Sequence, residues 1–387
     1  MKRALLLLLL SVSTLWGQFL PDIPDRLSYV AQLNGTSQYF SKTSPTKMDL
    51  NGSELITLAA NRDFEDSVGT WTGSGNHTIV RTTGDKKAGS ASGLISSSGA
   101  GDTTTNYVTL PANAFTVLVN GTKATIETWA RSGTATTTLS LNIGDTTLTS
   151  GNLSTTPGTF TKVVFNINVT AARIDVPFRW YLNKAVDSVF VDVNSLTQAY
   201  DIACVYKIKT SHPSGTGTIF HGGTGSIYLE MQISPNRQNI KLSDGTTIVT
   251  LTGASIPVND GRERTFAFTL NRTGSLDQYV YGGAAGTAQS VVSVGKISIG
   301  AFFVGIFNGT INLYNGQIGD LILVRYPSLP SNIASWIAHV NTQRFIPEPP
   351  GGGTTVLRLF GKENSAYDQS GTQGVLTNTG STPIIPR

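Results

Sequence analysis

The sequence predicts an all-β protein with two antiparallel sandwich (jelly-roll) domains, the second inserted into the first, and one late helix. Three observations support this fold class: apolar and polar residues alternate in many short segments, turn residues separate these segments, and helical spacing is scarce. The chain has 387 residues, more than one ordinary core accommodates. Only 13% of the residues are charged, a composition typical of turn-rich extracellular β proteins.

The first 17 residues, "MKRALLLLLLSVSTLWG", place two cations before an apolar run and small residues after it. This pattern predicts a secretory signal peptide, because the run is too short to span a membrane. A retained apolar anchor of an assembled particle protein is the alternative. We therefore expect a secreted or cell-surface protein, or else a virion component, without a transmembrane span.

The strands are predicted from period-two alternation. Segment 161–169 places Val163, Phe165, Ile167 and Val169 on one face, and segments 225–233 and 264–270 alternate in the same way. In 241–251, the Asp-Gly pair at 244–245 predicts a hairpin turn. Cys204 is the single cysteine, which excludes an intrachain disulfide, and its place on the apolar face of 200–208 predicts a buried core thiol.

One segment, 327–344, has helical spacing, with Ile333, Trp336, Ile337 and Val340 in a stripe. Ser331 or Asn332 could cap this helix, and we expect its stripe to lie on a sheet edge.

The C-terminal part begins with a Pro/Gly linker at 347–355. The remaining residues, 356–387, are too few for a core of their own. They are predicted to form either a flexible tail or a segment that docks on a partner.

Segment 58–197 resembles the jelly-roll carbohydrate-binding modules of the family 4/9 type. The resemblance runs in order through "NRDFEDSVGTW" as the opening strand, "DKKAGSASGLISS", "ATIETWARSG" and, as the closing strand, "DSVFVDVNSL". It implies a sandwich domain that binds carbohydrate or serves as a spacer.

The flanks resemble a laminin-G-like, concanavalin-type lectin domain. The segment 27–54, "LSYVAQLNGTSQYFSKTSPTKMDLNGSE", resembles its first strands, and "AYDIACVYKIKT" resembles their continuation. Segment 315–341 resembles its last strand and terminal helix. This implies an outer domain of 27–57 plus 198–346 around the inserted domain 58–197. Three sequential units, with 27–57 as a loose arm, are the alternative.

Catalytic motifs are missing from the sequence: it contains no nucleophile elbow, phosphate loop or zinc motif. Concanavalin-type glycosidases need two carboxylates on one sheet face, whereas Glu230 has no acidic neighbour along its strand and is interpreted as a solvent-face residue. His212 and His221 are interpreted as loop histidines rather than as a ligand pair. We therefore expect a protein that is not an enzyme. The net charge is +4, and the sequence has no run of Lys and Arg residues with interleaved aromatic residues, so nucleic acid is not an expected partner.

The resemblance to the carbohydrate-binding modules implies a structural calcium ion between the first and last strands. Glu65 and Asp192 occupy the matching positions, and Asp66 is adjacent. Calcium prefers several oxygen ligands, so these three residues are the candidate set.

Carbohydrate binding needs aromatic faces and polar groups. Tyr107, Arg179 and Tyr181 are the candidates, because Arg179 and Tyr181 alternate away from an apolar run. Trp71 and Trp129 are predicted to lie in the core.

Taken together, these features predict a non-catalytic extracellular glycan-binding or adhesion protein whose partner is a polysaccharide or cell-surface glycan. The alternative is a structural subunit of a phage virion or surface filament, with copies of itself or other subunits as partners.

Overall fold

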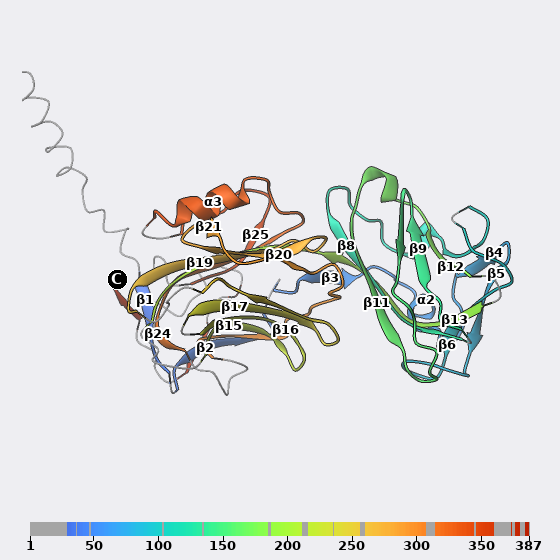
Figure 1. Cartoon of the computed structure of the whole chain (residues 1–387), viewed down its shortest axis with the longest axis horizontal. Coiled ribbons are helices and arrows are strands. Elements are labelled where there is room, and N and C mark those ends of the chain that lie inside the picture. The colour runs from blue at the N-terminus through green and yellow to red at the C-terminus, as the bar shows by residue number, and fades with distance from the viewer. Residues whose placement is uncertain are drawn as a thin grey trace, which may run out of the picture.

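The chain folds into two lobes that lie side by side (Figure 1). The computed structural model describes residues 29–35, 37–45, 48–102, 104–133, 135–184, 187–210, 216–234, 236–255, 260–306, 314–343, 346–359, 373, 376–379 and 384–386. These residues form four antiparallel sheets and very few helical turns, which confirms the predicted all-β sandwich fold. The predicted leader, 1–17, and His212 lie outside the described residues.

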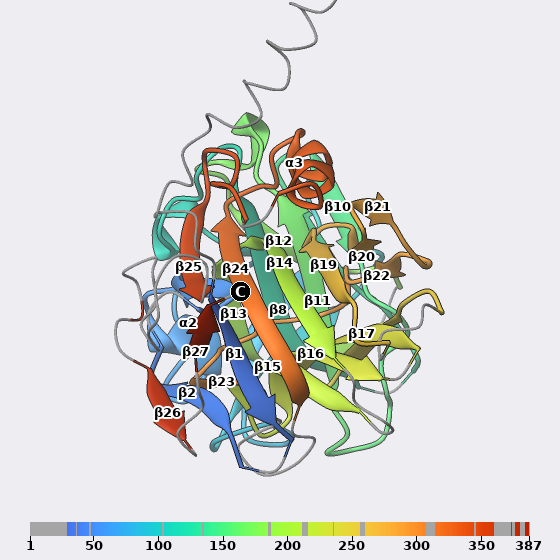
Figure 2. The same ribbon diagram turned by 90° about the vertical axis from the view of Figure 1, so that its left-hand side faces the viewer.

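We call the strands of 29–43 and 201–386 the outer lobe. Its nine-stranded sheet contains β1 (Tyr29–Asn34), β14 (Asp201–Thr210), β19 (Glu263–Leu270), β20 (Ser275–Val280), β21 (Gly283–Ala284), β22 (Gln289–Ser290), β24 (Asn315–Tyr326), β25 (Thr354–Leu359) and β27 (Ile384–Pro386). The order is β21-β20-β19-β14-β24-β1-β27, with β22 beside β20 and β25 beside β24 (Figure 2).

The second sheet of the outer lobe has seven strands within the described residues. They are β2 (Tyr39–Thr43), β15 (Gly217–Thr224), β16 (Ile227–Ser234), β17 (Arg237–Asp244), β18 (Ile248–Thr252), β23 (Ala301–Val304) and β26 (Thr377–Thr379). The order is β18-β17-β16-β15-β23-β2-β26. The predicted hairpin is present as β17 and β18, where Gly245 has φ +87° and the Asp244 carboxylate accepts the N–H groups of Thr246 and Thr247.

The two sheets of the outer lobe enclose one apolar core. In β16 the inward face carries Leu229, Met231 and Ile233, as the alternation predicts. Cys204 is fully buried in this core, and burial raises the pKa of its thiol, so the prediction of a core thiol is confirmed.

Helix α3 (Ile333–Val340) covers the outer face of the nine-stranded sheet (Figures 1 and 2). Its stripe packs against alternate residues of β14, β19 and β24. The predicted location on a sheet edge is therefore wrong, because these strands carry apolar residues on both faces. Asn332 is the N-cap residue, but its side chain makes no capping hydrogen bond.

The C-terminal segment forms strands in the sheets of its own chain. Strand β25 begins at Thr354, inside the predicted linker, and pairs with β24. Strands β26 and β27 pair with β2 and β1. These residues of the predicted tail thus extend both sheets of the outer lobe.

The inner lobe comprises 51–199 and again has two sheets. One contains β4 (Thr72–Ser74), β7 (Tyr107–Leu110), β9 (Leu139–Ile143), β10 (Thr146–Thr149) and β12 (Phe178–Leu182), in the order β10-β9-β12-β7-β4. The other contains β3 (Asn51–Glu54), β5 (His77–Thr82), β6 (Ser92–Ser97), β8 (Lys123–Ser132), β11 (Thr161–Asn168) and β13 (Asp187–Ala199), in the order β11-β8-β13-β6-β5, with β3 beside β13. Short helical turns are α2 (Ala59–Asp63), η2 (Ala112–Ala114) and η3 (Ala171–Arg173).

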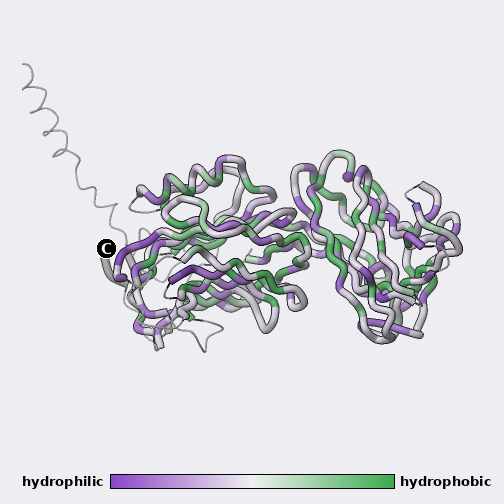
Figure 3. The backbone as a smooth tube through the Cα atoms, in the orientation of Figure 1, coloured by the Kyte–Doolittle hydropathy of each residue, from purple (hydrophilic) through white to green (hydrophobic). Residues whose placement is uncertain are grey.

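The inner lobe has its own core, and Figure 3 shows hydrophobic segments in both lobes. Strand β3 lies within the range that the sequence assigned to the outer domain, yet it pairs with β13 of the inner lobe. The boundaries of the two predicted domains otherwise stay a prediction.

The opening stretch of the inner lobe differs from the expected strand. Asn61 lies within helix α2, which ends at Asp63, and Phe64 follows in the left-handed region at φ 55°, so the chain turns before the next strand, β4, begins. Trp71 is in the core as predicted, with its indole N–H donating to the Asn61 carbonyl at 2.9 Å. Trp129 is only half-buried, and the Lys87 ammonium lies 4.0 Å from its ring centroid, so its predicted core position is wrong.

Buried charges join the two lobes. The Lys123 ammonium of β8 lies 2.6 Å from the Asp201 carboxylate of β14. The Lys162 ammonium of β11 lies 3.1 Å from Asp244 of β17. Arg272 is fully buried and donates to the Gly295 carbonyl and to Thr125 across the junction. Buried ion pairs need well-placed partners, so this network fixes how the lobes meet.

Candidate functional site

The outer face of the five-stranded sheet is lined with polar side chains. Phe178, Trp180 and Leu182 of β12 point into the core, so Arg179 and Tyr181 point outward. The register places Arg179 between Asn142 of β9 and Thr109 of β7. The face as a whole carries Thr72, Ser74, Tyr107, Thr109, Ser140, Asn142, Thr147, Thr149, Arg179 and Tyr181.

The structure brings the three predicted binding residues together on this face. The Arg179 guanidinium lies 4.6 Å from the centroid of the Tyr107 ring, close enough for a cation–π contact. Tyr181 is 7% exposed, and a Cβ atom at Gly101 would come within 2.7 Å of its Cβ atom. A loop thus covers Tyr181, which does not fit the role of an open stacking platform.

The loop beside Tyr107 is held by a carboxylate that the sequence analysis missed. Asp102 accepts the backbone N–H groups of Thr104 and Thr105 and the amide N–H of Asn106. These hydrogen bonds hold the pKa of Asp102 well below its usual range, and the one from the backbone N–H of Thr105 has the largest effect. An Asp-x-Thr-Thr-Asn run is the sequence signal that could have indicated this ordered rim.

The polar groups along the sheet form ordered contacts. Asn183 donates to the Ser140 hydroxyl at 2.9 Å, and Ser140 is 2.9 Å from the Thr149 hydroxyl. Thr147 and Thr149 are exposed at the β10 edge. Ser140 and Asn142 are buried, so at this end of the face the hydroxyl groups available to a neutral polar ligand are those of Thr147 and Thr149.

The predicted calcium ligands Glu65 and Asp192 both accept hydrogen bonds from one loop. Both Glu65 oxygens accept the backbone N–H of Ser90, and Asp192 accepts the N–H groups of Lys87 and Ala88. Hydrogen bonds from Ser90 lower the pKa of Glu65, whereas burial raises the pKa of Asp192. The two carboxylates thus clamp the loop 86–90.

Asp66 is exposed and does not join this clamp. Among the described residues, no group of three or more His, Cys, Asp or Glu side chains could hold a metal ion. The carboxylates of Glu65 and Asp192 are directed at N–H donors of the loop 86–90, whereas calcium needs several oxygen ligands directed at one point. As placed, the three residues do not fit a calcium ion.

A second polar cluster lies on the outer face of the seven-stranded sheet. His221 of β15 faces Glu230 of β16, which faces Lys241 of β17, with its carboxylate 3.7 Å from the lysine ammonium. The Tyr228 ring lies 5.6 Å from the His221 ring. His221 and Glu230 are each only 1% exposed, so two interpretations were wrong: His221 is a buried strand residue, and Glu230 is not open to solvent.

Burial changes the acidity of this cluster. It lowers the pKa of His221 to about 4 and raises the pKa of Glu230. The Glu230 carboxylate accepts hydrogen bonds from Gln232 at 2.8 Å and from Thr218 at 3.3 Å. The described groups that contact or face Glu230 are thus an amide, a hydroxyl, an ammonium and an imidazole.

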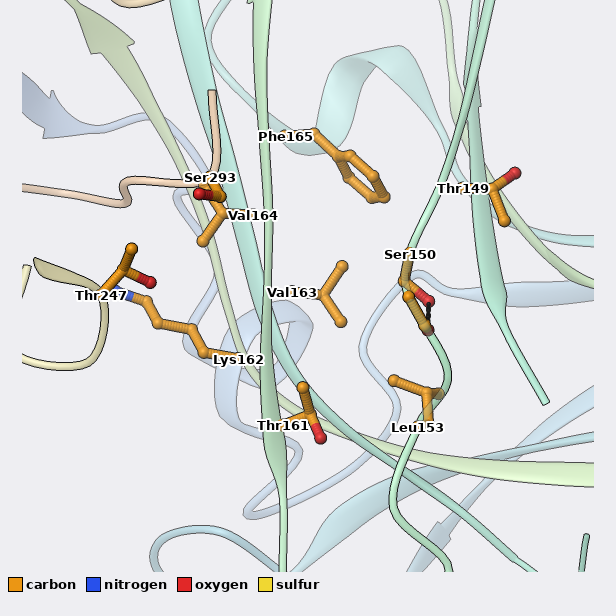
Figure 4. A pocket seen from close by; sticks show the side chains of 11 residues that line it. Thr149, Ser150, Leu153, Thr161, Lys162, Val163, Val164, Phe165, Thr247 and Ser293 are labelled. Atoms are coloured by element: carbon orange, nitrogen blue, oxygen red, sulfur yellow. Dashed lines mark hydrogen bonds between the residues drawn. The ribbon is translucent and has the colours of Figure 1, made fainter. Parts of the chain in front are cut away.

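Pockets lie beside the junction between the lobes, and two of them differ clearly in volume. Figure 4 shows the smaller, of about 210 Å³, where Val163 and Phe165 of the inner lobe face Ser150 and Leu153, with Thr247 and Ser293 of the outer lobe at one side. The larger, about 400 Å³, lies where the chain crosses between the lobes. The larger one falls within the usual range of about 300–1,000 Å³ for ligand sites, whereas the smaller one does not.

No family model and no curated protein matches the chain. The family resemblances therefore stay predictions. Within the described part of the chain, no helix is long and apolar enough to cross a membrane.

Solved structures show similarity over about a third of the chain. One is the botulinum neurotoxin serotype D binding domain, at 14% identity and TM-score 0.30, covering 37% of this chain and 35% of that one. Another is the CBM22-1 xylan-binding domain of Paenibacillus barcinonensis Xyn10C, at 12% identity and TM-score 0.30, covering 36% and 92%. A third is the CBM40 of Ruminococcus gnavus IT-sialidase bound to α2,3-sialyllactose, at 15% identity and TM-score 0.30, covering 37% and 83%. Similarity this low carries no inference about a ligand.

Proposed function

We propose that the protein is a non-catalytic, extracellular glycan-binding protein, and that the outer face of the five-stranded sheet binds the carbohydrate. One observation carries this proposal: a continuous row of hydroxyl, amide, guanidinium and phenol groups crosses all five strands on one face. Sugars are bound by such groups together with an aromatic ring.

The Tyr107–Arg179 pair would define the centre of the site. The guanidinium can donate to sugar hydroxyls while its contact with the Tyr107 ring keeps it in place. Asn142 and Thr109 flank Arg179 on the neighbouring strands. Asn142 is 7% exposed and its amide nitrogen donates to the Thr146 carbonyl, so a glycan lying across the strands would meet Thr109, Arg179 and the exposed Thr147.

A glycan array with the full chain tests the proposal. We expect binding to at least one polysaccharide, and we expect Tyr107→Ala and Arg179→Ala each to weaken it. Tyr281→Ala is a matched control, because the exposed Tyr281 of the outer lobe also lies beneath an arginine, Arg264, at 5.4 Å. Absence of binding to every glycan, or equal loss in the control, would contradict the proposal.

A structural subunit of a virion or filament is the second candidate, and the C-terminal strands favour it. Strands β26 and β27 have three residues each and lie at sheet edges beside β2 and β1. Edge strands this short can be exchanged between copies of a chain, which would link them into an assembly. Light scattering of the concentrated protein tests this idea, because a monomer at high concentration contradicts it.

A further inference from the structure

The larger pocket at the junction, which we call the junction pocket, has the features of a second binding site. It is lined by Asp49, Asn51, Gly52, Ser53, Tyr200, Lys296, Ser298 and Arg325. Residues 49–53 lie where the chain enters the inner lobe, and Tyr200 lies where it returns between β13 and β14. Both lobe connections therefore contribute to one pocket of about 400 Å³.

The walls of the junction pocket are fixed by hydrogen bonds. The Asp49 carboxylate accepts the Ser298 hydroxyl at 3.0 Å. Asn51 is 3% exposed; its amide oxygen accepts the N–H of Ile297 at 3.0 Å, and its amide nitrogen donates to two buried threonines. A pocket with fixed walls loses little conformational entropy when it binds a ligand.

The junction pocket carries an excess of positive charge. The Arg325 guanidinium stacks 3.9 Å from the centroid of the Tyr200 ring, and its Nη1 donates to the Asp49 carbonyl at 3.1 Å. Within the described part of the chain, this is the guanidinium's one hydrogen bond, so further N–H donors remain for a ligand. Lys296 adds a second cation, against the single carboxylate of Asp49.

These groups select an anionic ligand that also has hydroxyl groups. A guanidinium fork matches the two oxygens of a carboxylate, and a nearby ammonium strengthens the attraction. Ser53 and Ser298 are exposed and offer hydroxyls to the rest of the ligand. A water molecule's share of liquid volume is only about 30 Å³, so a bare ion would leave the pocket mostly filled with water.

We propose that the junction pocket binds a carboxylate-bearing monosaccharide unit, a hexuronate, with Arg325 and Lys296 holding its carboxylate. The site lies apart from the five-stranded sheet, so it stands or falls independently of the proposed function.

Calorimetric titration of the full chain with D-glucuronate, D-glucose and inorganic phosphate tests this proposal. We expect glucuronate to bind and glucose, which lacks the carboxylate, not to bind. Phosphate binding as tightly as glucuronate would mean a bare anion site and overturn the sugar assignment. Absence of glucuronate binding would also overturn it.

Matched variants locate the site. We expect Lys296→Gln to weaken glucuronate binding about tenfold, because one charge-assisted contact is lost. The backbone N–H of Lys296, not its ammonium, holds Glu127, so this variant keeps the fold even where Arg325→Gln does not. Lys209→Gln is the control, because Lys209 is exposed at the far end of β14. Unchanged affinity in Lys296→Gln, or an equal loss in Lys209→Gln, refutes the assignment.

Discussion

The stability of the outer lobe should depend on pH through His221. This residue is 1% exposed, and burial lowers the pKa of its imidazole from 6.5 to about 4. In the unfolded chain the His221 imidazole binds a proton below about pH 6.5, whereas in the folded chain it does so only near pH 4. Between these values the unfolded state binds more protons, so the free energy of unfolding falls as the pH falls.

The magnitude follows from the gap between the two pKa values. Each pH unit corresponds to about 1.4 kcal/mol, so the gap from 6.5 to about 4 corresponds to about 3 kcal/mol. Glu230 faces His221, and its raised pKa acts in the opposite direction. As the pH falls, the Glu230 carboxylate takes up a proton in the folded chain at a higher pH than in the unfolded chain, which favours the folded state. The change in the free energy of unfolding of the native chain with pH therefore contains contributions from both His221 and Glu230.

Comparison with His221→Gln isolates the histidine, because glutamine does not titrate. Urea unfolding measured between pH 7.5 and 4 should show the native chain losing about 3 kcal/mol relative to this variant. His339→Gln, at an exposed histidine of α3, should follow the native chain throughout. A stability difference between native chain and His221→Gln that is the same at pH 7.5 and at pH 4 would refute the reasoning.

Three further predictions concern the junction and the inner lobe. Lys123→Met leaves a buried carboxylate unpaired and should lower the free energy of unfolding by about 3–5 kcal/mol in urea titrations, whereas the exposed Lys209→Met should change it by less than about 0.5 kcal/mol. Gly89→Ala should destabilise the chain more than Gly158→Ala in thermal melts, because both glycines have positive φ but only a Cβ atom at Gly89 would collide with the Glu65 carboxylate. Equal losses would contradict the clamp. Added calcium or a chelator should leave the melting temperature unchanged, and a rise of several degrees with calcium would restore the predicted metal site.

The elements that the sequence predicted well are those with a strong local pattern. Strand β16 alternates over its whole length, the Asp-Gly turn at 244–245 has one favoured backbone geometry, and α3 has a complete apolar stripe. Each depends on residues close together in the chain, which is why local reasoning was sufficient.

The elements that were missed depend on contacts between distant residues. Strands β26 and β27 have three residues each, too few for a period to show. The stretch at 61–71 was expected to be a strand because of its family resemblance, but Phe64 adopts a left-handed conformation and is completely buried in the core. Packing decided that conformation, and the sequence pattern carries no sign of it.

In the candidate sites, too, local sequence pattern predicted some features, whereas contacts between distant residues determined the others. Alternation alone placed Arg179 and Tyr181 on one outward face, and this is where they lie. The loop at Gly101 that covers Tyr181, and the neighbours that bury Glu230, come from other parts of the chain. The junction pocket unites residues from 49 to 325, so only the folded chain shows it.

The edge positions of β26 and β27 set the order in which the lobes can be completed during synthesis. Every strand of the inner lobe lies before residue 200, so that lobe can fold while the ribosome is still making the outer one. Strands β1 and β2 emerge before the inner lobe, whereas β27 and β26 beside them emerge after it. The outer lobe must therefore hold β1 and β2 unpaired on that side until β26 and β27 have been made, and loss of β26 and β27 would expose both as sheet edges.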